Sequence, residues 1–173
     1  MNSMDSPIQI RPLCKDDDPI AISRIYALSW KAAYRGIIPD AYLNALREDR
    51  WAPFLKDAKD IRSLVMIKDT QFIGTASVCP AREPKMAGWG ELVSIYLLPE
   101  YFGQGCGRLL LEAALAELER MDFKDIYLWV LRENHRARRF YEKNGFADSG
   151  ETGSYEISGE SIPELRYVCH CRQ

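Results

Sequence analysis

The sequence predicts a single α/β domain of the α+β type, built on a central twisted mixed sheet of about seven strands. Segments with strand and helix character follow one another in the order β-α-α-β-β-β-α-β-α-β-β. A strand–helix–strand unit over residues 91–131 implies a right-handed parallel crossover, which makes the sheet mixed. The chain has 173 residues, of which 47% are hydrophobic, and it contains no internal repeat that would indicate a domain boundary. We therefore expect one domain over residues 1–173.

The N-terminal part predicts one strand followed by two helices. Residues 8–13 alternate weakly between apolar and polar side chains, as a strand does. Asp18 can cap the helix that follows, Pro19 suits its first turn, and Gly36 is a plausible stop. A short second helix is expected over residues 39–50.

The middle of the chain predicts three consecutive strands. Residues 62–68 and 72–79 are apolar strands, and the four residues 68–71 favour a tight hairpin between them. Residues 80–90 contain two prolines and are expected to form a loop. The next strand covers residues 91–98.

The C-terminal part predicts two helices, a buried strand and a final hairpin. Residues 105–121 carry apolar side chains along one helical face. Residues 125–131 are almost continuously apolar, as in strands that are covered on both faces. Residues 134–144 predict a second helix, and residues 154–157 and 164–171 can pair as a terminal hairpin.

Composition excludes several classes of protein. The 23 basic and 25 acidic residues give a net charge of −2, which argues against a polybasic nucleic-acid binder. No run of about 18 apolar residues suggests a membrane span, and the N-terminus lacks a signal-peptide pattern. A cytoplasmic protein with no nucleic-acid or membrane partner is expected, in which the scattered cysteines are free thiols. These are Cys14, Cys79, Cys106, Cys169 and Cys171.

A glycine-rich turn follows the strand of residues 91–98. Gly103, Gly105 and Gly107 occupy alternate positions at the start of a predicted helix. Glycines allow unusual backbone conformations and close approach of a ligand, and the first N–H groups of a helix are unpaired and positive. The turn therefore suits a phosphate or pyrophosphate, although it matches neither a P-loop nor the dinucleotide fingerprint. The alternative is a tight strand-to-helix connection without a ligand.

Two motifs make the sequence resemble the GNAT superfamily of N-acetyltransferases. The family's first signature is a strand, a proline, and then Arg/Gln-x-x-Gly-x-Gly/Ala at the start of a helix. Here Pro99 precedes Phe102-Gly103-Gln104-Gly105-Cys106-Gly107, which departs from the pattern at Phe102. The second signature is Asn-x-x-Ala-x-x-x-Tyr-x-x-x-Gly-Phe. It is matched by Asn134, Ala137, Tyr141, Gly145 and Phe146.

The resemblance implies a sheet with helices on both faces and an enzyme that transfers an acetyl group from acetyl-CoA to a primary amine. Direct attack is expected because no His or acid partner lies beside Cys106 in sequence, and no metal is expected because only Cys169 and Cys171 of the Cys169-His170-Cys171 run share a strand face and no second ligand pair exists. It implies that backbone groups of one strand pair with the pantetheine arm, that the glycine turn holds the pyrophosphate, and that the helix of the second motif adds side-chain contacts. The residues so assigned to the cosubstrate are Ile95, Tyr96, Leu97, Gly103, Gln104, Gly105, Cys106, Gly107, Arg108, Asn134, Arg138 and Tyr141. Asn134 has a helix cap as its alternative role, and Arg138 a solvated surface position.

The reaction needs two proton transfers, for which the sequence offers candidates. A tyrosine with a pKa near ~10 is protonated at neutral pH, so Tyr141 can donate a proton to the leaving thiolate. Deprotonating a lysine-like amine at pH 7 costs roughly 4.6 kcal/mol, so a general base is expected. Glu91, which begins the strand beside the thioester in the resemblance, is the candidate, and His135 and His170 are weaker ones. The alternatives are a core role for Tyr141 and a surface role for Glu91.

The resemblance places the acceptor between the first two helices and the terminal hairpin. Trp30, Tyr34, Tyr155 and Tyr167 are the candidates for contact with it, and their alternative role is hydrophobic packing. Residues 147–165 carry acidic and no basic side chains and could attract a cationic amine, whereas the basic side chains of residues 132–143, which are Arg132, Arg136, Arg138, Arg139 and Lys143, could attract the cosubstrate's phosphates. A small amine or a polyamine-like metabolite is therefore expected. The alternative for either segment is a solvated face. A protein N-terminus or lysine as acceptor, a non-catalytic acyl-CoA sensor, and assembly as a homodimer stay open.

Overall fold

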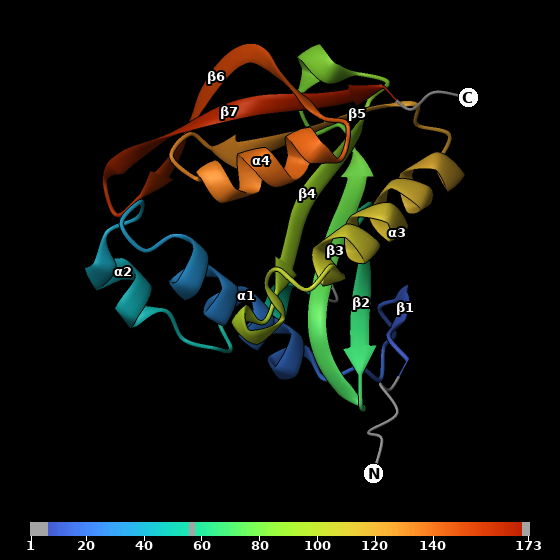
Figure 1. Cartoon of the computed structure of the whole chain (residues 1–173), viewed down its shortest axis with the longest axis vertical. Helices are drawn as coiled ribbons and strands as arrows, with labels where there is room; N and C mark the ends of the chain where they lie inside the picture. The colour runs from blue at the N-terminus through green and yellow to red at the C-terminus, as the bar shows by residue number, and fades with distance from the viewer. Residues whose placement is uncertain (1–6, 56–57, 171–173) are drawn as a thin grey trace.

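The computed structural model describes residues 7–55 and 58–170, and these form one seven-stranded mixed sheet with helices against it (Figure 1). The strand order is β1-β2-β3-β4-β5-β7-β6. The predicted order of elements and the mixed sheet are confirmed. The strands are β1 Gln9–Pro12, β2 Arg62–Lys68, β3 Gln71–Pro80, β4 Gly90–Leu97, β5 Asp125–Leu131, β6 Ala147–Ile157 and β7 Glu160–His170. The helices are α1 Pro19–Ala33, α2 Asp40–Ala45, α3 Cys106–Arg120 and α4 His135–Lys143.

Three parts of the sequence-based expectations lie outside the described residues. They are the N-terminal residues 1–6, the last residue of the strand expected over 164–171, and the thiol of Cys171. Within the described part, no helix is long and apolar enough to cross a membrane.

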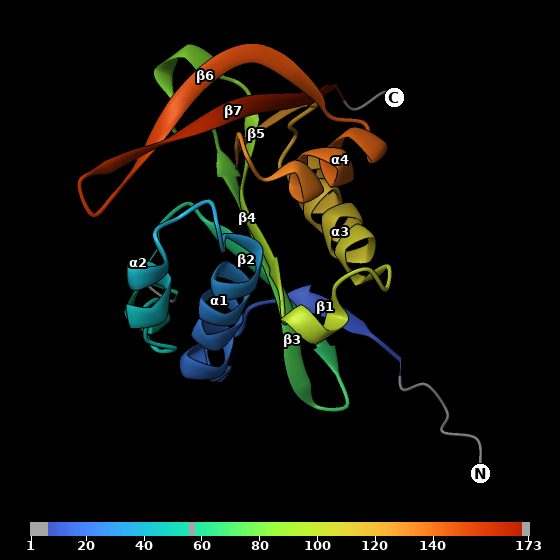
Figure 2. The same cartoon turned by 60° about the vertical axis from the view of Figure 1, so that its left-hand side comes forward.

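The helices cover both faces of the sheet, as Figure 2 shows: α1 and α2 lie on one side of β2–β4, and α3 and α4 lie on the other. On the α3 side, Leu110, Leu111 and Leu118 pack with apolar side chains of β2, β3, β4, β5 and β7 in the largest core cluster. On the α1 side, Trp30 and Leu43 pack with residues of β5 and β7 in a second cluster. The two faces of β5 and β7 therefore bury different sets of side chains, because side chains alternate along a strand.

The first two helices are shorter than the sequence predicts. Asp18 caps α1 as expected, since its carboxylate accepts a hydrogen bond from the N–H of Ile20 at 2.9 Å. The helix ends at Ala33 and not at Gly36, because the carbonyl of Tyr34 accepts from the N–H groups of Ile37 and Ile38 and turns the chain. The second helix, expected over 39–50, stops at Ala45.

The terminal hairpin is longer than predicted and its turn is tighter. β6 and β7 are joined by Ser158 and Gly159, which both have positive φ angles of 50° and 80°. Pro163 therefore lies inside β7 and not in the turn, where it pairs with Ser154 of β6. A proline is tolerated there because pairing of β7 with β5 begins only at Glu164.

Strands β4 and β5 pair only near their N-terminal ends and then diverge. β4 pairs with β3 along its whole length, but with β5 only at Gly90–Ile126 and Glu91–Tyr127. An irregularity opposite Ser77 and Val78 bends β4 at this level. Among the described strands, residues 92–97 consequently have no neighbour on the β5 side, and the sheet is open at its centre.

Candidate active site

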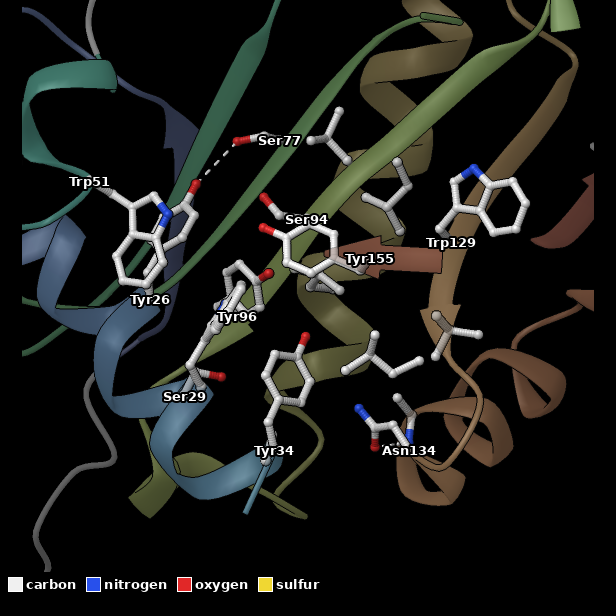
Figure 3. Close-up of a pocket in the computed structure, with 18 of the residues that line it drawn as sticks. Tyr26, Ser29, Tyr34, Trp51, Ser77, Ser94, Tyr96, Trp129, Asn134 and Tyr155 are labelled. Carbon is white, nitrogen blue, oxygen red and sulfur yellow. Dashed lines mark hydrogen bonds between the residues drawn. The ribbon is translucent and has the colours of Figure 1, made fainter. Parts of the chain in front are cut away.

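A cavity of about 510 Å³ lies where β4 and β5 separate. Its walls come from α1, β4, β5, the N-terminus of α4 and the β6–β7 hairpin. Figure 3 shows the side chains of Tyr34, Tyr96 and Tyr155 pointing into it, with Trp129 on the far side. The hydroxyl oxygen of Ser94 on β4 is buried and has no hydrogen-bond partner among the described residues. The cavity therefore offers an apolar interior with a few polar groups, as small-molecule sites do.

The glycine turn presents bare backbone at the start of α3. Gly103 and Gly105 have φ angles of 73° and 85°, and a Cβ on either would meet no heavy atom within 4 Å. Gly105 is the N-cap of α3, so the unpaired N–H groups of the first turn follow it directly. Both the empty space and the positive helix end fit a pyrophosphate group.

The remaining side chains of the turn are engaged within the protein. The amide of Gln104 donates to the carbonyl of Glu100, and Arg108 pairs with Glu112 at 2.8 Å one turn along α3. Cys106 is buried in the main core cluster, and Gly107 packs against Phe140. Beside these engaged side chains, the turn exposes its backbone at Gly103 and Gly105.

A cation lies beside the turn at Arg136, which the sequence places in a basic segment but which is not among the predicted cosubstrate residues. The guanidinium of Arg136 on α4 stacks over the ring of Phe102, 4.0 Å from its centroid. Arg136 lines the cavity, and no carboxylate of the described residues is within ion-pair distance of it. Burial lowers the pKa of Arg136, although a guanidinium remains charged. Phe102 stands where the family pattern has Arg or Gln. This departure was the signal that a cation from another part of the chain could lie beside the turn.

Tyr141 and Asn134 both lie at the cavity wall. Tyr141 is 9% exposed and packs between Phe140 and Phe146, and its burial raises the pKa of the phenol. Its hydroxyl is therefore protonated at neutral pH. Asn134 caps α4, since its Oδ1 accepts from the N–H of Ala137 at 3.2 Å. Its amide group borders the cavity as well, so the two predicted roles coincide in one side chain.

Arg138, predicted to contact a phosphate, is held elsewhere. Its Nε donates to the hydroxyl of Tyr167 at 3.0 Å, and its Nη1 donates to the carbonyl of Arg132 at 3.0 Å. These bonds keep the guanidinium at β7 and at the end of β5, and Arg138 does not line the cavity.

Glu91 lies at the cavity with both carboxylate oxygens already bonded. Oε1 accepts from Nη2 of Arg82 at 2.6 Å, and Oε2 accepts from Nε of Arg82 at 3.0 Å and from the hydroxyl of Tyr127 at 2.9 Å. Burial would raise the pKa of Glu91, but the bonds from Arg82 and Tyr127 outweigh it and hold the pKa below its ordinary value. Glu91 is thus ionised at neutral pH.

The two histidines lie away from the cavity. His170 bonds Asp125 at 2.6 Å near the opposite end of β5, and His135 is exposed beside Glu133. In the described part of the chain, no three His, Cys, Asp or Glu side chains form a group that could hold a metal ion.

Three of the four predicted acceptor residues come together. Trp30 contacts Tyr34 and Tyr155 edge to face, with ring centroids 5.0 Å and 6.1 Å apart, and all three line the cavity. Trp51, which the sequence-based prediction missed, packs against Trp30 in a tilted arrangement with ring centroids 5.4 Å apart. An aromatic wall of this kind suits an alkyl chain or a cation.

Tyr167 does not line the cavity. It is fully buried in the main core cluster, where its hydroxyl donates to Glu142 at 2.7 Å. The reason is strand parity: Leu165 and Tyr167 of β7 face α3 and α4, whereas Ile162 and Glu164 face α1 and the cavity.

Comparison with known proteins places these features in a family. Residues 22–146 match the model of the Acetyltransferase (GNAT) family. The chain is 32% identical over 157 residues to the protein named Uncharacterized N-acetyltransferase YuaI of Bacillus subtilis (strain 168), covering 87% of each. It is 29% identical over 151 residues to a Spermidine N(1)-acetyltransferase of Thermoplasma acidophilum, covering 85% of this chain and 92% of the relative.

Solved structures share the fold. The crystal structure of PaiA N-acetyltransferase from Thermoplasma acidophilum in complex with coenzyme A superposes with a TM-score of 0.70 at 24% identity, over 95% of this chain and 99% of that one. A ribosomal-protein-alanine N-acetyltransferase from Brucella melitensis gives a TM-score of 0.73 at 20% identity, over 94% and 99% of the two chains.

Proposed function

Because the chain belongs to the GNAT acetyltransferase family and is an acetyl-CoA-dependent N-acetyltransferase, we propose that its acceptor is a primary amine of a small molecule. One observation carries this proposal: a cavity of about 510 Å³, walled by aromatic side chains, lies at the gap between β4 and β5. A volume of this size suits a small molecule. The sequence relative that is named as a spermidine acetyltransferase supports the same class of acceptor.

The chain's own groups fit the cosubstrate along a continuous path. Ile95, Tyr96 and Leu97 lack a strand neighbour on the β5 side, so their backbone is free to pair with an extended amide-containing arm. The turn from Gly103 to Arg108 offers backbone N–H groups to the pyrophosphate, and Asn134 borders the path between them. When bound, acetyl-CoA supplies an activated acetyl thioester. The hydroxyl of Ser94, buried without a partner in the described part of the chain, faces this path.

Tyr141 is the proposed general acid. As the amine nitrogen bonds to the acetyl carbon, the carbon–sulfur bond breaks and the sulfur takes up the electron pair. The hydroxyl of Tyr141, which burial keeps protonated, can give its proton to that sulfur. A thiolate leaves readily on its own, so this donation assists the reaction without being indispensable to it.

Glu91 is the proposed base that receives the proton of the amine, through a water molecule. It lines the cavity and is ionised. Its bonds to Arg82 and Tyr127 also make it a weak base, because a proton on Glu91 would replace favourable contacts. We therefore expect Glu91→Gln to lower kcat while leaving the KM for acetyl-CoA unchanged.

A panel of amines tests the proposal. The protein is mixed with acetyl-CoA and, in turn, with monoamines, diamines, an amino sugar and a peptide that begins with alanine, and the released thiol is followed. Turnover with small amines and none with the peptide is the expected result. Preference for the peptide would instead favour a protein acetyltransferase, and coenzyme A binding without thiol release from any acceptor would favour a non-catalytic sensor.

A further inference from the structure

The acceptor wall of the cavity contains a carboxylate that the reaction described so far does not use. Glu164 on β7 is half-buried and lines the cavity. It pairs with Leu131 of β5 and Gly153 of β6, so it lies in the middle of the sheet and not at an edge. Its side chain is on the α1 face, together with Ile162 and the aromatic side chains of Trp129 and Tyr155.

The basic groups around Glu164 pair with other carboxylates, although Nε of Arg166 is buried without a hydrogen-bond partner among the described residues. Arg82 pairs with Glu91 at 2.6 Å, and Arg166 pairs with Glu83 at 3.8 Å. Among the described residues, no basic group lies within ion-pair distance of Glu164. Burial and the neighbouring Glu83 raise the pKa of Glu164, as expected for a carboxylate without a counter-ion.

The position of this carboxylate is built into the surrounding packing. A Cβ on Gly153 would come within 3.3 Å of Oε1 of Glu164 and within 3.0 Å of the indole of Trp129. The absence of a side chain at Gly153 therefore makes room for the carboxylate beside the aromatic ring. A carboxylate next to Trp129 and Tyr155 provides both an ion-pair partner and aromatic faces for a cation.

The sheet places Glu164 at a distance from the reacting atoms. Continuing the Glu91–Tyr127 pairing by four residues brings Ile95 of β4 level with Leu131, which pairs with Glu164. Neighbouring strands are about 4.8 Å apart, so β7 lies on the order of 10 Å from β4, and more where the strands diverge. An amine held at β4 for acetylation is thus too far from Glu164 to be the group that it binds.

We propose that Glu164 binds a second cationic group of the acceptor, and that the preferred acceptors are therefore diamines or longer polyamines in which several methylene groups separate two charged nitrogens. This inference rests on the proposed function and narrows it. The far ammonium ion pairs with Glu164 between Trp129 and Tyr155. The intervening chain lies along the aromatic wall, and the near nitrogen is presented to the gap between β4 and β5.

Two amines that differ only in the second charge test this assignment. With hexane-1,6-diamine, Glu164→Gln is expected to lower kcat/KM by at least about tenfold, as the loss of a charged hydrogen bond does. With hexylamine, the variant is expected to match the wild-type protein, which also shows that it is folded. Glu160→Gln is the matched control, because it removes the same charge from an exposed position of β7 outside the cavity.

Equal losses with both amines, or no loss with either, would overturn the role of Glu164. Binding of hexamethonium, a dication that cannot be acetylated, gives a second readout by calorimetry in the presence of coenzyme A. Its dissociation constant should rise at least about tenfold in Glu164→Gln, because the variant loses the charge attraction to a quaternary nitrogen, and stay unchanged in Glu160→Gln. If no amine releases thiol, the proposed function fails, and the hexamethonium measurement still decides whether Glu164 binds a dication.

Discussion

The proposed donor side and the proposed acceptor side of the cavity are built in different ways. On the donor side, the gap along β4, the turn at Gly103–Arg108 and the start of α4 follow one another, and they present mainly backbone groups. On the acceptor side, side chains from α1, β5, β6 and β7 converge from distant parts of the chain. The donor side therefore depends on local conformation, whereas the acceptor side depends on strand register and on which face of a strand each side chain occupies.

The largest expected effect is at the boundary between the two sides. Tyr141→Phe should lower kcat about 100-fold, at the low end for loss of a general acid, since the thiolate is a good leaving group. The affinity for coenzyme A should change little, because the ring and its packing against Phe146 remain. Steady-state kinetics with both substrates, together with coenzyme A binding, check this. An unchanged kcat would assign Tyr141 to packing alone.

The second effect concerns stability at the point where β4 meets β5. Arg82→Met should reduce the free energy of unfolding by about 2 kcal/mol, because it leaves the buried carboxylate of Glu91 without its cation. The value is moderate because the Arg82 side chain is 57% exposed and partly screened by water. Urea unfolding of the variant and the wild-type protein at pH 7 measures this difference.

The same ion pair predicts a pH dependence. The pKa of Glu91 is lower in the folded protein than its ordinary value of 4.5, so its contribution is complete above that value. The contribution is lost as the pH falls through the lowered folded pKa. The difference in stability between wild type and Arg82→Met should therefore shrink in acid, and a difference that grows below pH 4.5 would contradict this account.

A smaller effect tests whether the donor side depends on bare backbone. Gly105→Ala should raise the KM for acetyl-CoA about tenfold, because a Cβ with φ of 85° is strained and occupies the space offered to the pyrophosphate. Gly150→Ala is the control, since Gly150 has a φ of 81° and equally open surroundings in β6, outside the cavity. Similar KM values for the two variants would contradict the idea that the donor side depends on exposed backbone at Gly105.

The smallest expected effect concerns the cation on Phe102. Arg136→Gln should raise the KM for acetyl-CoA about fivefold, as the loss of one charge beside a phosphate site does, and should leave the KM for an acetylated pantetheine fragment without phosphates unchanged. Kinetics with the two donors give this ratio directly. An equal increase for both donors would mean that Arg136 acts on the shape of the cavity and not on phosphate charge.

The contrast between the two sides also explains how far the sequence could predict the molecule. The element order and the donor-side glycines could be predicted because strands, helices and turns leave local patterns in the sequence. The orientation of the Tyr167 side chain could not be predicted, because it depends on the register of β7. The pairing of β6 with β7 is irregular between Asp148 and Thr152. The roles inferred for Arg136 and Glu164 depend on neighbours far along the chain, Phe102 and Trp129, which no local spacing brings together.

The two-pair contact between β4 and β5 has a mechanical consequence. The described sheet consists of an antiparallel part, β1–β4, and a second part, β5–β7, and the strands hold these parts together only at Gly90–Ile126 and Glu91–Tyr127. Leu118 of α3 and Phe123 press against Gly90, where a Cβ would come within 2.8 Å and 3.0 Å of them. The end of α3 therefore covers the short contact between the two parts. In the proposed function, a donor lying between β4 and β5 would contact both parts and add a connection that the strands themselves lack beyond Glu91.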